Sequence, residues 1–364
     1  MARLLVTGGA GFIGSNFAHY WLRQHPGDRV VVLDALTYAG NRANLAGLGE
    51  RGAFRFVQGD ILDFQQVISL LREESLDTIV HFAAETHVDR SILGSGDFVS
   101  TNLRGTHSLL EAARGVWLAG DGLPHRFHHI STDEVYGSLE EDEPAFTEQI
   151  PYRPNSPYAA SKAGSDHLVR AWHQTYGLET TISNCSNNYG PYQYPEKLIP
   201  LAILNLLHGR PVPIYGDGRQ IRDWLHVEDH CRGIEGALSR GVPGGVYNIG
   251  GGQEHRNIAL IETLCGLVDR RFESDAGLAG RYPDAPPARG LASSTSIEFV
   301  RDRPGHDRRY AIDFTRASAD IGYAPTVSLE AGLERTLKWY LAGRQWWLPL
   351  LGDDFRAWID RQYG

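Results

Sequence analysis

The sequence predicts an α/β fold, with a doubly wound parallel sheet and a smaller mixed lobe towards the C-terminus. In the first half of the chain, short apolar runs alternate with helical patterns, which is typical of repeated βαβ units. The apolar runs are continuous rather than alternating, as expected for strands whose two faces are both buried. The chain has 364 residues, which leaves room for one large domain or two modest ones.

The expected elements follow in order. Strands are predicted at Arg3–Val6, Arg29–Leu33, Phe54–Gln58, Thr78–Phe82 and Arg126–Ser131, and helices at Phe12–Arg23, Phe64–Glu74 and Asn102–Leu118. After Tyr189, glycine and proline become frequent, as in GPYQYPEK and GRPVPIYGDGRQ. We therefore expect residues 1–189 to form the sheet domain, with segments near 223–252 and 309–318 returning to it. Residues 190–364 are expected to form mainly the second lobe.

Two parts of the second lobe have no predicted role in chemistry. The stretch Ala276–Ser296 contains PDAPPARG, and a long irregular stretch of this kind indicates a surface insertion or a partly mobile loop. The segment WWLPLL and the final tryptophan-bearing helix are expected to serve packing.

Composition narrows the class of protein. Acidic residues outnumber basic ones, 44 to 35, for a formal charge of −9, whereas a nucleic-acid binder usually has the opposite balance. There is no apolar run of membrane-spanning length and no signal-peptide pattern, so we expect a cytoplasmic protein without membrane contact. Cys185, Cys231 and Cys265 are too widely spaced to indicate a disulfide framework or a metal site.

A glycine-rich turn, TGGAGFIG, follows the first strand and opens the first helix. Gly8, Gly11 and Gly14 allow a tight turn and bring a pyrophosphate to the backbone and the helix N-terminus. Asp34 ends the second strand about 20 residues later, where an acidic residue binds an adenosine ribose and disfavours NADP. Residues 1–189 are therefore expected to be a Rossmann-type dinucleotide-binding domain for NAD. A turn that only serves helix packing is the alternative.

A Tyr-x-x-x-Lys pair lies at Tyr158 and Lys162. Residues four apart share one face of a helix, and an ammonium close to a phenol lowers the pKa of the phenol. The tyrosine is then able to exchange a proton with a sugar hydroxyl near neutral pH. Lysine is rare in this chain, with only Lys162, Lys197 and Lys338, which favours this interpretation over a surface helix pair.

Two adjacent carboxyl groups, Asp133 and Glu134, follow Thr132 at the end of the strand Arg126–Ser131. Ligands of such sheets lie beyond the carboxyl ends of the strands. Hydride transfer alone does not need two carboxylic acids, but removing a carbon-bound proton and protonating a departing hydroxyl does. A helix-capping Asp-Glu pair is the alternative.

These motifs resemble the extended short-chain dehydrogenase/reductase superfamily. More narrowly, TDEVYG, AAETHVDRS, SNCSNNYGPYQYPEKLIPLAI, YGDGRQIRDWLHVEDH and RPGHDRRYAID resemble the dTDP-glucose 4,6-dehydratases over nearly the whole chain and in the same order. The related sugar-nucleotide epimerases and decarboxylases share the glycine turn and the Tyr/Lys pair but usually lack the Thr-Asp-Glu triplet, so Asp133 is the discriminating residue.

The resemblance implies a mechanism. Tyr158 takes the proton of the glucose 4-hydroxyl, hydride passes from carbon-4 to NAD, and Thr132 hydrogen-bonds the new ketone. Glu134 then removes the carbon-5 proton and Asp133 protonates the 6-hydroxyl, so that water leaves before hydride returns to carbon-6. The implied product is dTDP-4-keto-6-deoxyglucose, a precursor of deoxysugars such as rhamnose. Catalysis is assigned to Thr132, Asp133, Glu134, Tyr158 and Lys162.

The resemblance also implies the ligand contacts. For NAD the residues are Gly8, Gly11, Phe12, Ile13, Gly14, Asp34, Asp60, Ile61, Ala83, Ala84, Thr101, Tyr158 and Lys162. For the nucleotide sugar they are Glu85, His87, Thr132, Asn188, Lys197, Leu198, Tyr215, Arg222, Asn257, His306 and Tyr310. Arg222 is expected on the diphosphate and Tyr215 on the thymine ring. An arginine paired with Asp223, a core-facing tyrosine and, for Asp60, an ordinary turn aspartate are the alternatives.

Two other functions remain open. The first is dehydration of another nucleotide sugar, such as UDP- or CDP-glucose. The second is a non-catalytic NAD-binding regulator, against which the joint presence of Tyr158, Lys162, Asp133 and Glu134 argues. Helices near Asn102–Leu118 and Ala159–Thr175 are expected to form a four-helix face between two copies, because the superfamily often uses this surface, so a homodimer is expected.

Overall fold

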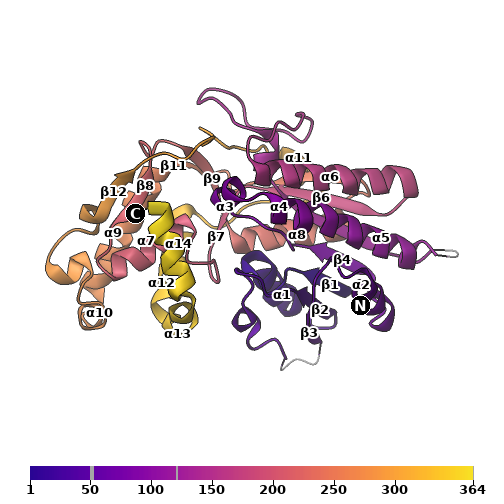
Figure 1. The fold of residues 1–364 in the computed structure, drawn as a ribbon, viewed down its shortest axis with the longest axis horizontal. Helices are drawn as coiled ribbons and strands as arrows, with labels where there is room; N and C mark the ends of the chain where they lie inside the picture. The colour runs from indigo at the N-terminus through magenta and orange to yellow at the C-terminus, as the bar shows by residue number, and fades with distance from the viewer. Residues whose placement is uncertain (50–52, 120–121, 364) are drawn as a thin grey trace.

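The computed structural model describes residues 1–49, 53–119 and 122–363, and a parallel sheet forms its centre (Figure 1). Within the described residues, seven strands pair in the order β10-β6-β5-β4-β1-β2-β3, and every neighbouring pair is parallel. They are β1 (Arg3–Thr7), β2 (Arg29–Asp34), β3 (Phe54–Gln58), β4 (Thr78–His81), β5 (Arg126–Thr132), β6 (Thr180–Cys185) and β10 (Gly245–Ile249). The predicted α/β fold with a Rossmann-type sheet is confirmed.

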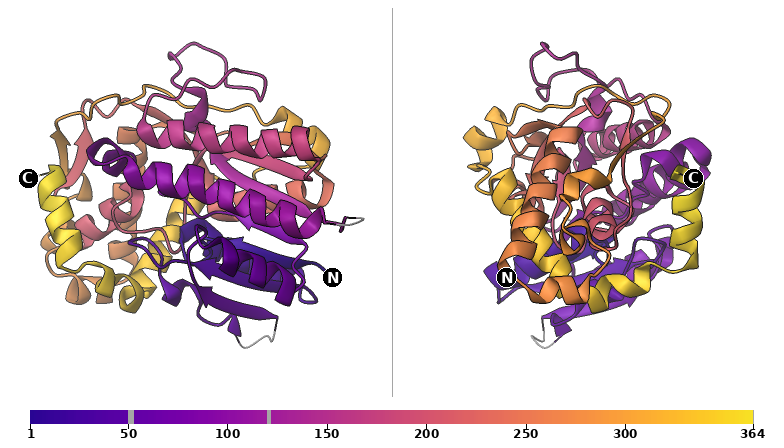
Figure 2. Two further views of the ribbon diagram at one scale, coloured as in Figure 1. Left: turned by 45° about the vertical axis from the view of Figure 1, so that its right-hand side comes forward. Right: turned by 90° about the vertical axis from the view of Figure 1, so that its left-hand side faces the viewer.

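Helices cover both faces of this sheet. On one face lie α1 (Phe12–Gln24) and α8 (Val227–Arg240), and on the other α2 (Phe64–Glu73), α5 (Thr106–Trp117) and α6 (Pro157–Tyr176). Alternate residues of β1 point to opposite faces, so Leu4 packs with α1 and Leu5 packs with α5. Figure 2 shows α5 and α6 side by side in front of the sheet. Burial on both sides explains why the strands are continuously apolar.

The strand order reverses between β1 and β4, and this reversal fixes where the functional loops meet. The chain leaves β1 towards β2 and β3, and it returns on the other side of β1 to form β4 and β5. The carboxyl ends of neighbouring parallel strands therefore open a crevice at one edge of the sheet. The glycine turn, the loop after β4 and the Thr132–Glu134 segment all lie at that edge.

The predicted helix Asn102–Leu118 begins earlier and is irregular. The segment α3 (Val88–Leu93) and the short α4 (Gly96–Phe98) precede η3 (Val99–Gly105), a π-helical turn that runs into α5. Asn102 in this turn exchanges hydrogen bonds with the backbone of Glu85, at 2.9 and 3.0 Å, and donates to Ser161 Oγ at 2.8 Å. The turn therefore ties the loop after β4 to α6, a constraint that helical periodicity alone does not reveal.

The second lobe has a core of its own. Its sheets are β11-β9-β7 and β12-β8, and its helices surround a cluster that includes Ile203, Leu264, Leu337 and Trp347. The strands are β7 (Asn187–Tyr189), β8 (Val212–Tyr215), β9 (Ile221–His226), β11 (Glu254–Arg256) and β12 (Ile297–Val300). The helices are α7 (Leu198–Leu207), α9 (Asn257–Ser274), α10 (Gly277–Arg281), α12 (Leu329–Ala342), α13 (Arg344–Trp347) and α14 (Asp353–Tyr363), while α11 (Thr315–Ile321) packs beside α8.

The stretch Ala276–Ser296 was predicted to be a surface insertion or a partly mobile loop. The first of these alternatives, a surface insertion, is wrong. Leu278, Tyr282 and Ala285 are at most 4% exposed and belong to the core of the second lobe. The segment forms α10 and the short turns Pro286–Arg289 and Ser293–Ser296, which pack against α9. Its prolines and glycines are typical of a loop, but Leu278, Tyr282 and Ala285 belong to the same buried cluster as side chains of α9.

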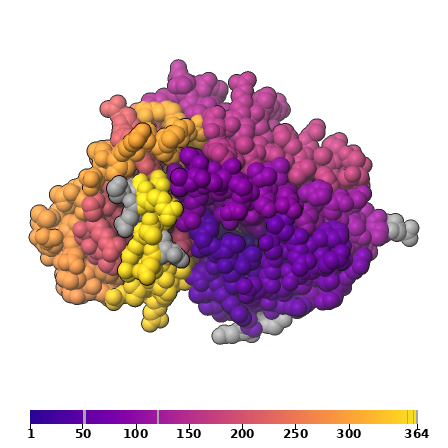
Figure 3. Space-filling view, viewed as in Figure 1, coloured from indigo at the N-terminus to yellow at the C-terminus, as the bar shows by residue number. Residues whose placement is uncertain are grey.

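The C-terminal segment lies between the two halves of the molecule (Figure 3). Trp347 is fully buried in the second core, as expected for packing. Trp358 of α14 has a further contact, because its ring stands edge-on to His87 with the centroids 5.2 Å apart. The final helix therefore covers residues of the loop after β4.

Leu278→Ala tests whether Ala276–Ser296 is part of the core. Removing a buried leucine side chain leaves a cavity, so the free energy of unfolding is expected to fall by about 2–5 kcal/mol. The matched control is Leu291→Ala in the same segment, where the side chain is 51% exposed and a change within about 0.5 kcal/mol is expected. Urea unfolding measures both, and equal midpoints for the two variants would contradict the assignment.

Candidate active site

The glycine turn has the close backbone contacts that its sequence predicted. Gly8 adopts a φ of +66°, and a Cβ built there would lie 2.6 Å from the backbone of Ala83. A Cβ at Gly14 would lie 2.5 Å from the carbonyl oxygen of Gly8. No described side chain caps the N-terminus of α1, whose first residue follows Gly11. The N-terminus of α1 is therefore left without a side-chain cap, as a site for an anionic ligand requires.

A cavity of about 320 Å³ opens in front of this turn. Its walls come from the turn, from the loops after β2, β3 and β4, from the end of β5 and from α6. All the predicted NAD contacts line it, namely Gly8, Gly11, Phe12, Ile13, Gly14, Asp34, Asp60, Ile61, Ala83, Ala84, Thr101, Tyr158 and Lys162. Thr132, Asp133, Glu134, Glu85, Asn188 and Lys197 line it as well. The fold thus brings the predicted cofactor and reactive residues into one space.

Asp34 is held by the glycine turn itself. Its carboxylate accepts hydrogen bonds from the backbone N–H groups of Ala10 and Leu36, both at 2.8 Å. Burial raises its pKa, which these backbone donors oppose. Of the neighbouring predicted residues, Asp60 is exposed, whereas Ile61 is 4% exposed and packs against Gly105 of the π-helical turn.

The reactive carboxyl groups lie on a short 3-10 turn, η4 (Asp133–Tyr136), that begins where β5 ends. Thr132 caps this turn, because its Oγ1 accepts from the backbone N–H of Glu134 at 3.3 Å, and its hydroxyl lies 3.3 Å from Asp133 Oδ1. Asp133 is 2% exposed, and its Oδ2 has no hydrogen-bond partner among the described residues. The helix-cap alternative therefore applies to Thr132 rather than to Asp133 and Glu134.

The two carboxyl groups differ in their electrostatic surroundings. Burial raises the pKa of Asp133 well above its usual value, and the neighbouring Glu134 raises it further. Burial also raises the pKa of Glu134, but the cations of Arg303, Arg222 and Lys197 oppose that rise. Adjacent carboxyl groups with unlike surroundings divide into one acid and one base. Burial thus favours the protonated form of Asp133 more strongly than that of Glu134.

Tyr158 and Lys162 lie on the first turns of α6, as predicted, but the expected sign of the tyrosine shift is wrong. The pKa of Tyr158 is raised well above its usual value, first by burial and then by the charge of Glu134, while a hydrogen bond with Thr132 opposes the rise. The Lys162 ammonium instead donates to the Ile130 carbonyl oxygen at 2.7 Å. The phenol therefore stays protonated in the chain alone.

The predicted contacts of the sugar nucleotide form a second, basic cluster next to Glu134. Arg222 is 4% exposed, donates to the Asp307 carbonyl oxygen at 2.9 Å, and lies over the Tyr310 ring with its guanidinium carbon 4.3 Å from the ring centre. The side chain of Asp223 points elsewhere and accepts from the backbone of Gly251 and Gln253. The alternative of an Arg222–Asp223 pair is therefore wrong.

The remaining predicted contacts lie around this cluster. The Tyr215 hydroxyl lies 3.4 Å from Asp89 Oδ2 and accepts from Gln362 Nε2 at 2.6 Å, so this tyrosine is not simply a core residue. His306 bonds Asp302 at 2.6 Å, and its ring centre is 6.0 Å from that of Tyr215. Asn257 and Leu198 begin α9 and α7, respectively.

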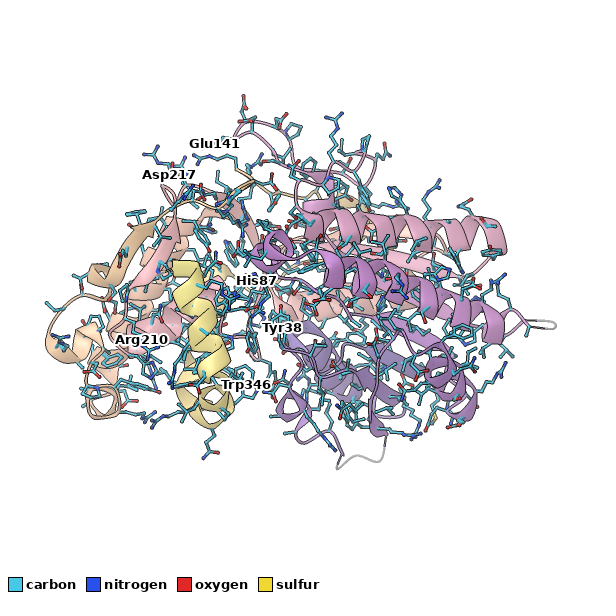
Figure 4. The ribbon with its side chains drawn as sticks, in the orientation of Figure 1. Tyr38, His87, Glu141, Arg210, Asp217 and Trp346 are labelled. Carbon is cyan, nitrogen blue, oxygen red and sulfur yellow. The ribbon has the colours of Figure 1, made fainter. Side chains whose placement is uncertain are left out.

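The basic cluster around Arg222 also includes residues that were not predicted from the sequence. Arg303 lies 3.5 Å from Asp89, and its charge acts on Glu134, Lys197 and His306. It belongs to RPGHDRRYAID, so the motif that selected His306 contained the information. Glu196 and Arg90 pair at 3.0 Å beside His87. Figure 4 shows Tyr38 and His87 at the boundary between the N-terminal half and the C-terminal helix.

The described part of the chain has neither a cluster of metal ligands nor a membrane-spanning helix. It contains no group of three or more His, Cys, Asp or Glu side chains placed to hold a metal ion. Among the same residues, no helix combines the length and the apolar character needed to cross a membrane.

Known proteins match this chain over nearly its whole length. Residues 5–336 match the family model described as GDP-mannose 4,6 dehydratase. A dTDP-glucose 4,6-dehydratase from Neisseria meningitidis serogroup B is 50% identical over 360 residues, which cover 98% of each chain. Another, from Salmonella typhimurium, is 46% identical over 372 residues and covers 99% of each chain. This chain belongs to the dTDP-glucose 4,6-dehydratase family.

Solved structures agree with this placement among the dehydratases. A dTDP-glucose 4,6-dehydratase from Streptomyces venezuelae, crystallised with NAD bound, is 49% identical, has a TM-score of 0.82 and covers 96% of this chain and 99% of its own. A UDP-glucuronic acid 4-epimerase from Bacillus cereus has a TM-score of 0.80 at 28% identity, covering 93% and 99%. The fold is thus shared with epimerases, while the higher identity belongs to the dehydratase.

Gly8→Ala tests the role of the turn in this dehydratase. A methyl group at a φ of +66° and 2.6 Å from the backbone of Ala83 is expected to cost about 1–3 kcal/mol of stability and to weaken NAD binding. Calorimetric titration with NAD measures the affinity. Gly27→Ala is the matched control, since a Cβ there meets nothing within 4 Å. Equal NAD affinity in both variants would show that the backbone approach is not needed.

Proposed function

We propose that this chain converts dTDP-glucose to dTDP-4-keto-6-deoxyglucose with NAD, which makes it a hydro-lyase. The observation that carries the proposal is the placement of Asp133 and Glu134 in one cavity with Tyr158 and the dinucleotide-binding turn. A simple dehydrogenase needs no second carboxyl group there, whereas elimination of water needs both an acid and a base. The family membership of the chain supports the same reaction.

The cavity fits NAD. At Gly8 and Gly14 a Cβ would fill the space where backbone approaches backbone, and Asp34 stands at the end of β2, where a ribose diol is bound in this fold. When bound, oxidised NAD brings a positive charge into the cavity, accepts hydride from carbon-4 and returns it to carbon-6. We propose that the residues predicted to contact NAD hold it in this cavity.

Tyr158 is proposed as the group that removes the proton of the 4-hydroxyl. Its pKa is high in the chain alone because of burial and Glu134, and a positive charge brought close to the phenol lowers that pKa. The tyrosine thus becomes a base only in a loaded site. Thr132, whose hydroxyl acts to lower the pKa of Tyr158, is proposed to donate to the same sugar oxygen as it becomes a ketone.

Glu134 and Asp133 are proposed to carry out the elimination. The cations of Arg303, Arg222 and Lys197 favour the ionised form of Glu134, as a base for the carbon-5 proton requires. Burial favours the protonated form of Asp133, as an acid for the 6-hydroxyl requires. Once a ketone stands at carbon-4, the carbon-5 proton is acidic and the departing hydroxyl leaves as water. When hydride returns to carbon-6, carbon-5 takes up a proton again.

We propose that residues 190–364 mainly bind the nucleotide, while 1–189, with 223–252 and 309–318, form the dinucleotide domain. The buried guanidinium of Arg222 and the ammonium of Lys197 are suited to a diphosphate. Tyr215, at the end of β8, is suited to stacking on a base. Glu85, His87, Asn188, Leu198, Asn257, His306 and Tyr310 are proposed as further contacts.

We further propose a cytoplasmic homodimer whose product is used to make deoxysugars such as rhamnose. The adjacent helices α5 and α6 form a continuous outer face (Figure 2), which supports the dimer through the four-helix arrangement common in the superfamily. Cys185, Cys231 and Cys265 are free and buried, as is usual in a reducing compartment.

Turnover of dTDP-glucose tests the proposed function. The purified protein is incubated with NAD and dTDP-glucose, and a 4-keto product is expected from its absorbance in alkali. UDP-glucose and CDP-glucose serve as matched substrates. Comparable rates with all of them would remove the thymidine assignment. If none of the three nucleotide sugars gives a product, a non-catalytic NAD-binding protein would be favoured.

Asp133→Asn is expected to slow elimination much more than oxidation. The amide keeps the shape but has no proton to donate, and loss of a general acid costs about 100-fold or more. In the unaltered protein, elimination falls as pH rises through the raised pKa of Asp133, because the acid form is the active one. Rapid-mixing absorbance of the reduced nicotinamide separates the two steps, and Tyr158→Phe, which slows oxidation, is the contrast. Equal slowing of both steps by Asp133→Asn would contradict the acid role.

A further inference from the structure

Behind the proposed catalytic pair, the ammonium of Lys162 is buried in the protein. The residue is 4% exposed. Its Nζ donates to the Ile130 carbonyl oxygen at 2.7 Å and lies 3.4 Å from Nε2 of His129. A neutral carbonyl and a neutral ring do not balance a charge removed from water, and a buried lysine without a counter-ion loses its proton.

A carboxylate lies beside the same ring nitrogen of His129. Asp166 follows Lys162 by one helical turn of α6, and its Oδ1 lies 3.2 Å from His129 Nε2. Asp166 is 1% exposed and His129 is fully buried. The other carboxylate oxygen of Asp166 accepts from Ser131 Oγ at 2.8 Å, so the group is anchored to β5 directly before Thr132.

The other groups that face Lys162 carry no negative charge near neutral pH. From β4 and β5 come the imidazoles of His81 and His129, whose pKa values burial lowers far below their usual range. From β6 comes the Cys185 thiol and from α6 the Tyr158 phenol, and burial raises the pKa of each. Of the described groups facing the ammonium, Asp166 is therefore the one that supplies negative charge.

The ring of His129 explains how the two charges share one partner. A neutral imidazole carries one proton, and Nδ1 of His129 has no hydrogen-bond partner among the described residues. Lys162 Nζ lies 3.4 Å and Asp166 Oδ1 lies 3.2 Å from the other ring nitrogen, Nε2, and Oδ1 has no hydrogen-bond partner among the described residues. Lys162 then keeps its bond to Ile130 and feels the carboxylate charge across a short distance in a dry interior.

We propose that Asp166 is a positioning residue, which keeps the ammonium of Lys162 charged and bonded at the end of β5, with both groups lying beside Nε2 of His129. The importance of Asp166 for turnover rests on the role proposed above for Lys162. The electrostatic coupling between Asp166 and Lys162 does not depend on that role. The pKa shifts agree with this arrangement. Burial lowers the pKa of Lys162 to about 8, against which Asp166 acts, and burial raises the pKa of Asp166 to about 6. Both groups are charged between these values.

The scarcity of lysine makes this coupling directly measurable. Isotope-labelled lysine introduces labels only at Lys162, Lys197 and Lys338, and Lys197→Arg and Lys338→Arg assign the NMR signals. In the unaltered protein, the Lys162 signal is expected to titrate near pH 8, with a second, smaller displacement near pH 6 when Asp166 takes up its proton. Absence of the second displacement would overturn the proposal without any Asp166 variant.

Asp166→Asn removes the charge and keeps the size of the side chain. The midpoint of the Lys162 titration is expected to fall by about 1 pKa unit or more, because the ammonium loses its counter-charge, and the second displacement is expected to vanish. The signal of Lys338, which pairs with Glu334 on the surface, is the internal control for folding. An unchanged Lys162 midpoint in Asp166→Asn would overturn the proposal.

Ser165→Ala is the matched control on the same helix. Ser165 is fully buried and lies 3.3 Å from His129 Nε2, but its hydroxyl carries no charge, so the Lys162 midpoint is expected to stay in place. A shift as large as that of Asp166→Asn would show that packing, not charge, sets the midpoint.

Turnover of dTDP-glucose as a function of pH links the coupling to catalysis. In Asp166→Asn, the fall of turnover on the alkaline side of the pH profile is expected at lower pH, because Lys162 loses its proton at lower pH. The acid limb is expected to stay in place, because Lys162 is still charged at low pH in both proteins. A uniform drop at every pH would show a merely structural role. If the unaltered protein has no activity while its Lys162 titration is as expected, the proposed function fails and the charge coupling stands.

Discussion

The arrangement of the proposed catalytic residues depends on one hydrogen bond, which Lys162 Nζ donates to the carbonyl oxygen of Ile130. It attaches α6 to the last residues of β5, so that Tyr158, one turn earlier on the helix, comes close to Thr132 at the end of the strand. Because β5 lies next to β4 in the sheet, the same contact brings α6 to the loop whose backbone touches the glycine turn. Cofactor residues and acid–base residues therefore share one cavity.

Burial determines the protonation states in this cavity. Burial raises the pKa values of Asp133 and Tyr158 well above their usual range, whereas the cations of Arg222, Arg303 and Lys197 oppose the same rise at Glu134. A low-dielectric site amplifies such differences between neighbouring groups. The net charge of the chain is negative, but these three cations act together on Glu134, which lines the cavity.

Much of the site was predictable because it depends on local sequence. The glycine turn, the acidic residue after β2 and the triplet after β5 are consecutive residues at strand ends, and the parallel sheet brings such ends together. Arg303 and Asp166 were not selected, because their importance comes from side chains far away in sequence, such as Asp89 and His129. The segment Ala276–Ser296 was misjudged for the same reason, since only its packing on α9 shows that it belongs to the core.

By itself the sequence determined the fold class, the dinucleotide turn, the family and the types of residue that perform the chemistry. Only the tertiary structure decided how those groups are charged. A Tyr-x-x-x-Lys spacing predicts that two side chains share a helix face, but not where the ammonium points, and here it points to Ile130 and the ring of His129. The pKa of Tyr158 is consequently raised rather than lowered. Spacing is a property of one helix, whereas the electrostatic potential at a buried atom is the sum over every element packed around it.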